Sequence, residues 1–161
     1  MSDEGSRFAM VLERIARRCV TQFRDISNSD LNRSLVLPES NTAFALATHL
    51  IGAAEYWVLH LAGGHDVHRD RPSEFHASGT RDELVARYER WLTAMKDVLS
   101  KLPDEKLDQR VSVRAGYHPS LENAPMTVRD ALLHAVEHCA VHQGHLELTR
   151  QLLGYPPAGA R

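Results

Sequence analysis

The chain has 161 residues, a length that suits one domain with a hydrophobic core of its own. Its formal net charge of −2 argues against a nucleic-acid binder that works through a broad basic surface. No apolar run reaches the roughly 18 residues of a membrane span, and the acidic start Met1–Glu4 does not resemble a signal peptide. Cys19 and Cys139 are too few and too far apart in the sequence to form a disulfide framework. We therefore expect a cytoplasmic protein. From its length, we expect a single domain over residues 1–161.

Two amphipathic helices are expected in the first half of the chain. Apolar residues recur at helical spacing over residues 3–25, and the polar run 27–30 breaks the pattern. The second helix is expected over residues 40–62, with Ser40 or Asn41 as its N-cap and a Gly-Gly pair at its end.

The third helix is expected to begin at a capping box, in which Thr80 is followed three residues later by Glu83. Apolar residues then recur about every 3.5 residues, until Pro103 ends the helix. The fourth helix has a looser capping box, Thr127 with Asp130, and is expected to run to Leu153. Four amphipathic helices with almost no strand signal predict an all-α protein, most simply a four-helix bundle.

Two long links separate these helices, residues 65–79 and 104–123. The alternating piece 110–114 is expected to form a short extended segment. Long loops on a rigid bundle commonly carry specificity, so we expect the links to shape the mouth of any pocket.

The most unusual feature of the chain is a cluster of histidines on the predicted fourth helix. Four of the ten histidines, His134, His138, His142 and His145, follow one another at intervals of four, four and three. These intervals place them on one face of a helix. The pair His138 and His142, at i and i+4, can chelate one divalent metal ion through two imidazole nitrogens.

A third metal ligand would have to come from another helix. Outside the fourth helix, His49 is the only histidine that lies near the middle of a predicted helix and borders its apolar seam. His60 has a similar face, but it lies roughly 16 Å further along the helix axis. Three neutral imidazoles around a metal leave a coordination position open, which is the catalytic pattern. We therefore predict a metal site formed by His49, His138 and His142.

The sequence leaves a simpler alternative open, in which these are core or surface histidines with ordinary hydrogen bonds. A buried seam does not favour repeated imidazoles without a polar partner, which weighs against that alternative. The zincin motif is absent, because Cys139 stands where that motif needs a glutamate. We expect Cys139 to be a buried apolar residue and His134 to be solvated, and we assign His145 no role. No residue stands out as a general base, with Glu55 and Tyr56 the nearest candidates.

Three stretches of the chain carry a resemblance to known proteins. They are Thr48-His49-Leu50-Ile51 with Ala54-Glu55-Tyr56-Trp57, then Glu74-Phe75-His76-Ala77-Ser78-Gly79-Thr80, and finally His138-x-x-x-His142-Gln143-Gly144-His145. Together they resemble the DinB/YfiT-like superfamily, which includes bacillithiol- and mycothiol-dependent enzymes. The superfamily more often has Arg-Gly-Gln where this chain has Gln143-Gly144-His145.

The resemblance implies a four-helix bundle in up-down-down-up order, often a homodimer. It also implies one divalent metal ion, zinc or nickel in relatives, on His49, His138 and His142. Members with known chemistry resemble transferases or isomerases that use a low-molecular-weight thiol. The expected function is therefore a metal-dependent thiol S-transferase with a small-molecule substrate and no nucleic-acid or membrane partner. A metal-dependent hydrolase, a non-catalytic metal-binding stress or regulatory protein, and a purely structural bundle stay open as alternatives.

Overall fold

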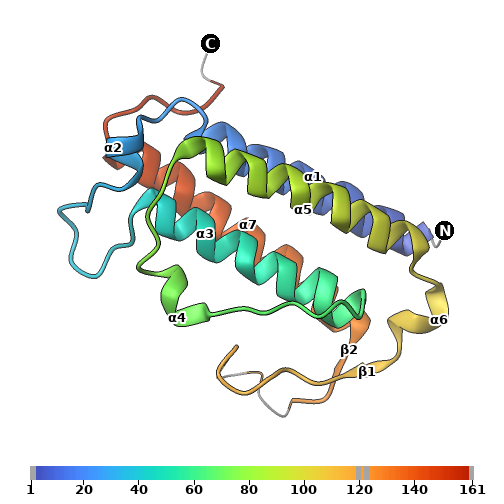
Figure 1. Cartoon of the computed structure of the whole chain (residues 1–161). Helices are drawn as coiled ribbons and strands as arrows, with labels where there is room; N and C mark the ends of the chain where they lie inside the picture. The colour runs from blue at the N-terminus through green and yellow to red at the C-terminus, as the bar shows by residue number, and fades with distance from the viewer. Residues whose placement is uncertain (1–2, 119–120, 122–123, 160–161) are drawn as a thin grey trace.

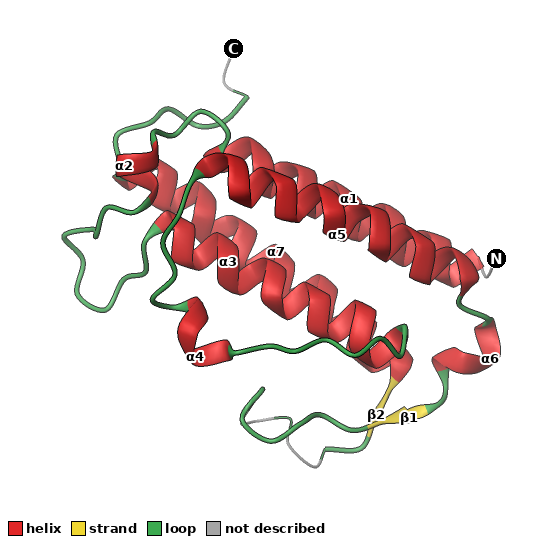
Figure 2. Ribbon diagram, in the orientation of Figure 1, coloured by secondary structure: helices red, strands yellow, loops and turns green. Residues whose placement is uncertain are grey.

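The computed structural model describes residues 3–118, 121 and 124–159, and four long helical rods dominate it (Figures 1 and 2). The rods are α1 (Asp3–Phe23), α3 (Ala43–Ala54) continued by the π-helix η1 (Glu55–Ala62), α5 (Arg81–Lys101) and α7 (Val128–Leu152). In Figure 1, α1 and α7 run in one direction while α3 and α5 run in the other. This arrangement confirms the predicted all-α four-helix bundle and its up-down-down-up order. Among the described helices, none has the length and apolar character needed to cross a bilayer.

The remaining elements are short and lie in the connections. They are α2 (Asn28–Leu31), α4 (Arg71–Glu74), α6 (Asp104–Leu107), β1 (Arg110–Val111) and β2 (Met126–Thr127). The two strands pair in antiparallel fashion, which confirms the predicted extended piece for its first two residues. The single-turn helices were not predicted, because one turn shows no apolar periodicity. Side-chain caps from Ser27 and Asp70 start α2 and α4, whereas α6 has none from the described residues.

The predicted capping boxes fix the starts of two rods. The Thr80 hydroxyl accepts a hydrogen bond from the Glu83 backbone N–H, and the Glu83 carboxylate accepts one from the Thr80 N–H in return. Thr127 and Asp130 make the same reciprocal pair. The predicted start of the second helix is wrong by one or two residues. Its N-cap is Thr42, whose hydroxyl accepts a hydrogen bond from the Ala45 backbone N–H.

The second half of that helix is a π-helix rather than the predicted α-helix. The wider turn is visible in the hydrogen bond from the Gly63 N–H to the Val58 carbonyl, five residues back, at 2.9 Å. Three consecutive residues of η1, Tyr56, Trp57 and Val58, are all buried. An ordinary amphipathic α-helix has one apolar face and does not bury three consecutive residues. The change of pitch thus coincides with more extensive burial.

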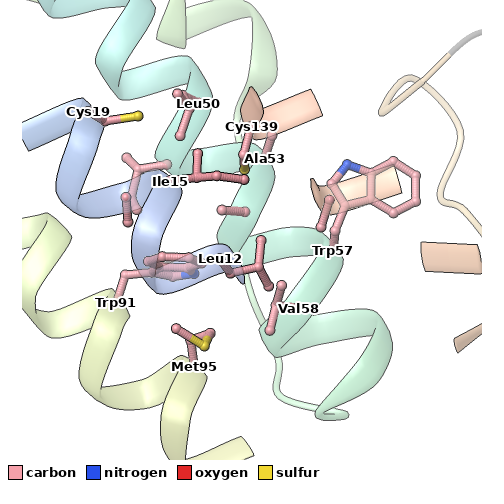
Figure 3. Close-up of a cluster of buried hydrophobic side chains, with 14 of the residues drawn as sticks. Leu12, Ile15, Cys19, Leu50, Ala53, Trp57, Val58, Trp91, Met95 and Cys139 are labelled. Carbon is pink, nitrogen blue, oxygen red and sulfur yellow. The ribbon is translucent and has the colours of Figure 1, made fainter. Parts of the chain in front are cut away.

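The apolar core fills the space between the four rods (Figure 3). Trp57 and Trp91 are both buried in it, as predicted, and so is Cys139. All twelve residues of α3 are buried. Helices α5 and α7 pack on α3, and α4 covers a further part of it. A polar residue on α3 is therefore removed from bulk water, which sets the conditions for His49.

Candidate metal centre

Three histidine rings converge between α3 and α7. The ring centroids of His49 and His138 are 5.2 Å apart, those of His49 and His142 are 5.0 Å apart, and those of His138 and His142 are 4.4 Å apart. One ring nitrogen from each residue lies within 4.8 Å of those of the other two, close enough for the group to hold one metal ion. The structure therefore brings together the three histidines that the sequence selected from ten.

His49 is held by a buried ion pair. Its Nδ1 lies 2.8 Å from Oε2 of Glu74, and the Arg69 guanidinium donates to both oxygens of the same carboxylate, at 2.7 and 2.8 Å. The His49 ring is only 3% exposed. A carboxylate that accepts a hydrogen bond from one imidazole nitrogen fixes the tautomer and leaves the other nitrogen free for a metal.

Glu74 is ionised despite its burial. Burial by itself raises the pKa of its carboxyl, but hydrogen bonds from His49 and Arg69 outweigh that effect and leave the pKa below its usual value. A carboxylate can only accept hydrogen bonds, so the shared proton belongs to Nδ1 of His49. The Nε2 atom of His49 is therefore the one available to a cation.

The chain leaves room for this carboxylate by placing a glycine on α3. A Cβ atom on Gly52 would lie 2.2 Å from Oε1 of Glu74, closer than any real contact. The Phe75 ring stacks on the His49 ring, with 4.6 Å between the ring centroids. Gly52, Glu74 and Phe75 together fix the position of the His49 ring.

The two long links meet beside this ion pair. Arg69 belongs to the first link, and its carbonyl accepts a hydrogen bond of 2.8 Å from the Tyr117 hydroxyl in the second. The Arg69 guanidinium also lies 5.9 Å from the centroid of the Tyr117 ring. The links therefore border the centre, as expected, and the second is tied to the arginine that neutralises Glu74.

His138 and His142 are positioned by α7 itself and carry no charge at neutral pH. Burial, followed by the neighbouring histidines, lowers the pKa of His138 to about 2. Burial, followed by His49 and His145, lowers the pKa of His142 to about 4. Nε2 of His138 is buried and finds no hydrogen-bond partner within the described residues. Neutral imidazoles, one with an unsatisfied buried nitrogen, form a donor set that fits a divalent metal ion.

The other histidines of α7 have different surroundings. The prediction that His134 is solvated is wrong, since its side chain is 16% exposed. It packs against Trp57, with 4.4 Å between ring centroids, and against His118 in the second link, with 5.0 Å. Sequence periodicity missed this burial because one covering residue lies on another helical segment and the other in a link. His145 is exposed, and its Nδ1 lies 3.2 Å from Nδ1 of His142.

The two residues considered as general bases are both engaged elsewhere. The Glu55 carboxylate accepts a hydrogen bond of 2.6 Å from Arg87. The Tyr56 hydroxyl accepts one from the Arg114 backbone N–H at 2.9 Å, and burial raises its pKa. Sequence reasoning instead missed Glu74 and Arg69 as functional residues. Glu74 lies in one of the stretches that carry the family resemblance, but that resemblance assigned it no role, and Arg69 lies outside those stretches.

Comparison with known proteins gives three findings. The chain is similar in fold to the crystal structure of a conserved protein from Enterococcus faecalis. That comparison has a TM-score of 0.72 and 14% sequence identity, and it covers 95% of this chain and 98% of the other. Among curated proteins, none matches this chain. The model of the mycothiol-S-transferase family matches residues 8–154. Since the match spans most of the sequence, the chain belongs to the mycothiol-S-transferase family, within the DinB-like superfamily.

Proposed function

We propose that the protein is a metal-dependent thiol S-transferase in which His49, His138 and His142 hold one divalent cation, zinc or nickel. The convergence of three imidazoles on one point, with His138 and His142 uncharged at neutral pH, carries the proposal. Membership of the mycothiol-S-transferase family supports a low-molecular-weight thiol as the donor and a small electrophile as the acceptor. Three protein ligands leave a position at which a thiol sulfur can bind.

When bound, the metal would lower the pKa of the thiol and keep its sulfur in the nucleophilic thiolate form. Glu74 holds the proton on Nδ1 of His49, and Arg69 compensates the buried charge of Glu74. In the overall transfer, the thiol releases its proton to solvent and a sulfur–carbon bond forms. The bond from that carbon to the leaving group breaks, and the leaving group departs with the electron pair.

A transfer assay tests this proposal. Mycothiol, bacillithiol and glutathione would each be offered with a model electrophile, to the metal-loaded protein and to the same protein after chelation. We expect transfer only with metal and a preferred thiol. The His138→Ala variant should be inactive, whereas His68→Ala, at an exposed histidine in a link, should match the unmodified protein. Equal rates before and after chelation would contradict the proposal.

The same preparation separates the alternatives. Ester or amide cleavage that needs metal but no thiol would favour a hydrolase. Tight metal binding without turnover of any thiol or ester would favour a stress or regulatory protein. Unchanged metal content in His138→Ala would favour a purely structural bundle.

Three further expectations accompany the proposal. We propose that residues 1–161 form one domain, that the protein is a homodimer and that it works in the cytoplasm. Sedimentation equilibrium of the metal-loaded chain tests the dimer, limited proteolysis tests the domain and cell fractionation tests the location.

A further inference from the structure

A cavity of about 290 Å³ opens beside the candidate metal centre, and His142 and His145 form part of its wall. We propose that this cavity binds the apolar alkyl or aryl part of an uncharged electrophilic substrate. The inference rests on the proposed transferase function, because it names the class of acceptor which that same centre serves.

The cavity runs along α3 and α7, away from the three histidines. His145, Leu148 and Leu152 recur at helical spacing after His142, so they line one face of α7. The opposite wall includes Leu46, which lies one helical turn before His49 on α3. One end of the cavity therefore lies at a proposed metal ligand, where the reacting carbon of a substrate has to be.

The walls are chemically suited to an apolar group. Five leucines contribute to them, namely Leu35, Leu37, Leu46, Leu148 and Leu152. Leu148 is 55% exposed, and Leu37 and Leu152 are about half exposed. Clustered apolar side chains left open to water mark binding sites on soluble proteins, because a ligand that covers them gains the free energy of their burial.

The charge on the described wall disfavours acidic ligands. Among the described residues that line the cavity, Glu39 is the one with a formal charge at neutral pH, and it is negative. No lysine or arginine of the described wall is placed to receive a carboxylate or a phosphate. An uncharged electrophile with an apolar substituent is the class of substrate that fits.

The loop that closes the cavity has a defined conformation. Glu39 adopts a φ of 59°, in the left-handed region that non-glycine residues rarely occupy. The turn is held by the Ser40 hydroxyl, which donates to the Leu37 carbonyl at 2.8 Å. Strained residues of this kind cluster at ligand-binding sites, where the surrounding contacts hold them in place. The loop thus presents Leu37 as part of a formed wall.

Equilibrium binding tests the cavity without relying on catalysis. The metal-loaded protein would be titrated with unreactive n-alkyl alcohols from butanol to octanol, and binding followed by NMR shifts of the leucine methyl groups. We expect affinity to rise about fourfold with each added methylene. Leu148→Asn should weaken octanol binding about fivefold, which corresponds to roughly 40 Å² of lost apolar contact.

Leu133→Asn is the matched control, because Leu133 lies on the same helix, is 53% exposed and is not part of the cavity wall. Its affinities should equal those of the unmodified protein. Equal losses in both variants, or affinity that does not change with chain length, would overturn the inference. A change of oligomeric state in Leu148→Asn without any change in alcohol binding would also overturn it, since the surface would then contact a second copy of the chain.

Kinetics with an n-alkyl halide series then connects the cavity to the reaction. In the unmodified protein kcat/KM should rise with chain length, and in Leu148→Asn the rise should flatten while KM for the thiol stays the same. Length-dependent alcohol binding without transfer of any thiol would support the cavity and overturn the transferase. Transfer that is insensitive to chain length in every variant would overturn the cavity and leave the transferase standing.

Discussion

His49 and the pair formed by His138 and His142 belong to the same centre, but the protein holds them in different ways. The pair is spaced by the α7 backbone, since residues four apart on a helix point in the same direction. His49 is aimed by tertiary contacts, in which Glu74 binds its Nδ1 and Arg69 neutralises Glu74. Helix geometry thus places two of the proposed ligands, while the third depends on a link that folds back to cover α3. Substitutions in the two arrangements should therefore reduce metal affinity by different amounts.

Removing a ligand from the helical pair should have the largest effect. Loss of a residue that only hydrogen-bonds to a metal ligand reduces metal affinity by up to roughly 100-fold. His138→Ala removes a proposed ligand itself, so we expect a larger reduction. Competition with a chromophoric chelator measures this change. Metal affinity in His138→Ala that equals that of the His68→Ala control would show that α7 does not contribute a ligand.

Disturbing the orientation of His49 should have a smaller effect. Glu74→Gln keeps the size of the side chain but removes the charge that binds Nδ1–H and Arg69, so metal affinity should fall about 10- to 100-fold. Glu55→Gln is the matched control, because Glu55 is also paired with an arginine, Arg87, but contacts none of the three histidines in any hydrogen bond described. Equal losses in the two variants would indicate a general electrostatic effect and would contradict the orienting role.

A methyl group at Gly52 tests the same contact from the opposite side. Gly52→Ala should push the Glu74 carboxylate away and reduce metal affinity by up to about tenfold, because Oε1 lies where the new Cβ would be. In a Glu74→Ala background the space is open, and the same substitution should raise the free energy of unfolding by about 1 kcal/mol through helix propensity. Urea unfolding of all four proteins gives the coupling, and additive effects would contradict the contact.

Acid should reveal the neutral state of the helical pair in the metal-free protein. His138 and His142 have pKa values of about 2 and about 4 in the folded chain, below the ordinary 6.5 that they regain on unfolding. Between about pH 6.5 and pH 4 the unfolded state therefore binds more protons, so the free energy of unfolding should fall as the pH is lowered. Urea unfolding of the chelated protein across this window measures the slope.

The corresponding control is the variant His138→Leu with His142→Leu, in which the slope between these pH values should flatten. A slope as steep as that of the unmodified protein would place the titrating groups elsewhere in the chain.

How far the sequence predicts this molecule depends on whether a feature is local. The starts of α5 and α7 were predictable because Thr80 and Thr127 carry their capping partners three residues away. The pair on α7 was predictable for the same reason, since its spacing is a property of one helix. His49 could be selected because it is an inward residue near the middle of a predicted helix.

The features that were missed depend on contacts between distant segments. Glu74 and Arg69 lie in a link without periodicity, and their role exists only because that link folds back on α3. His134 is covered by Trp57 and by His118, which comes from the second link. The π-helical pitch of η1 was also missed, because the same apolar run is compatible with an α-helix. The segment packs against α5 and α7, which its sequence alone does not reveal.

The π-helix η1 also affects how many residues related chains can have in this rod. A turn closed by hydrogen bonds five residues apart contains one residue more than an ordinary helical turn. A relative that lacks one residue between Glu55 and Ala62 can wind this segment as an α-helix and still reach the same glycine pair. His49 precedes the segment, so such a deletion leaves it in register with His138 and His142. The π-helix can thus absorb a change in chain length at the end of the rod that follows His49, without moving the candidate metal centre.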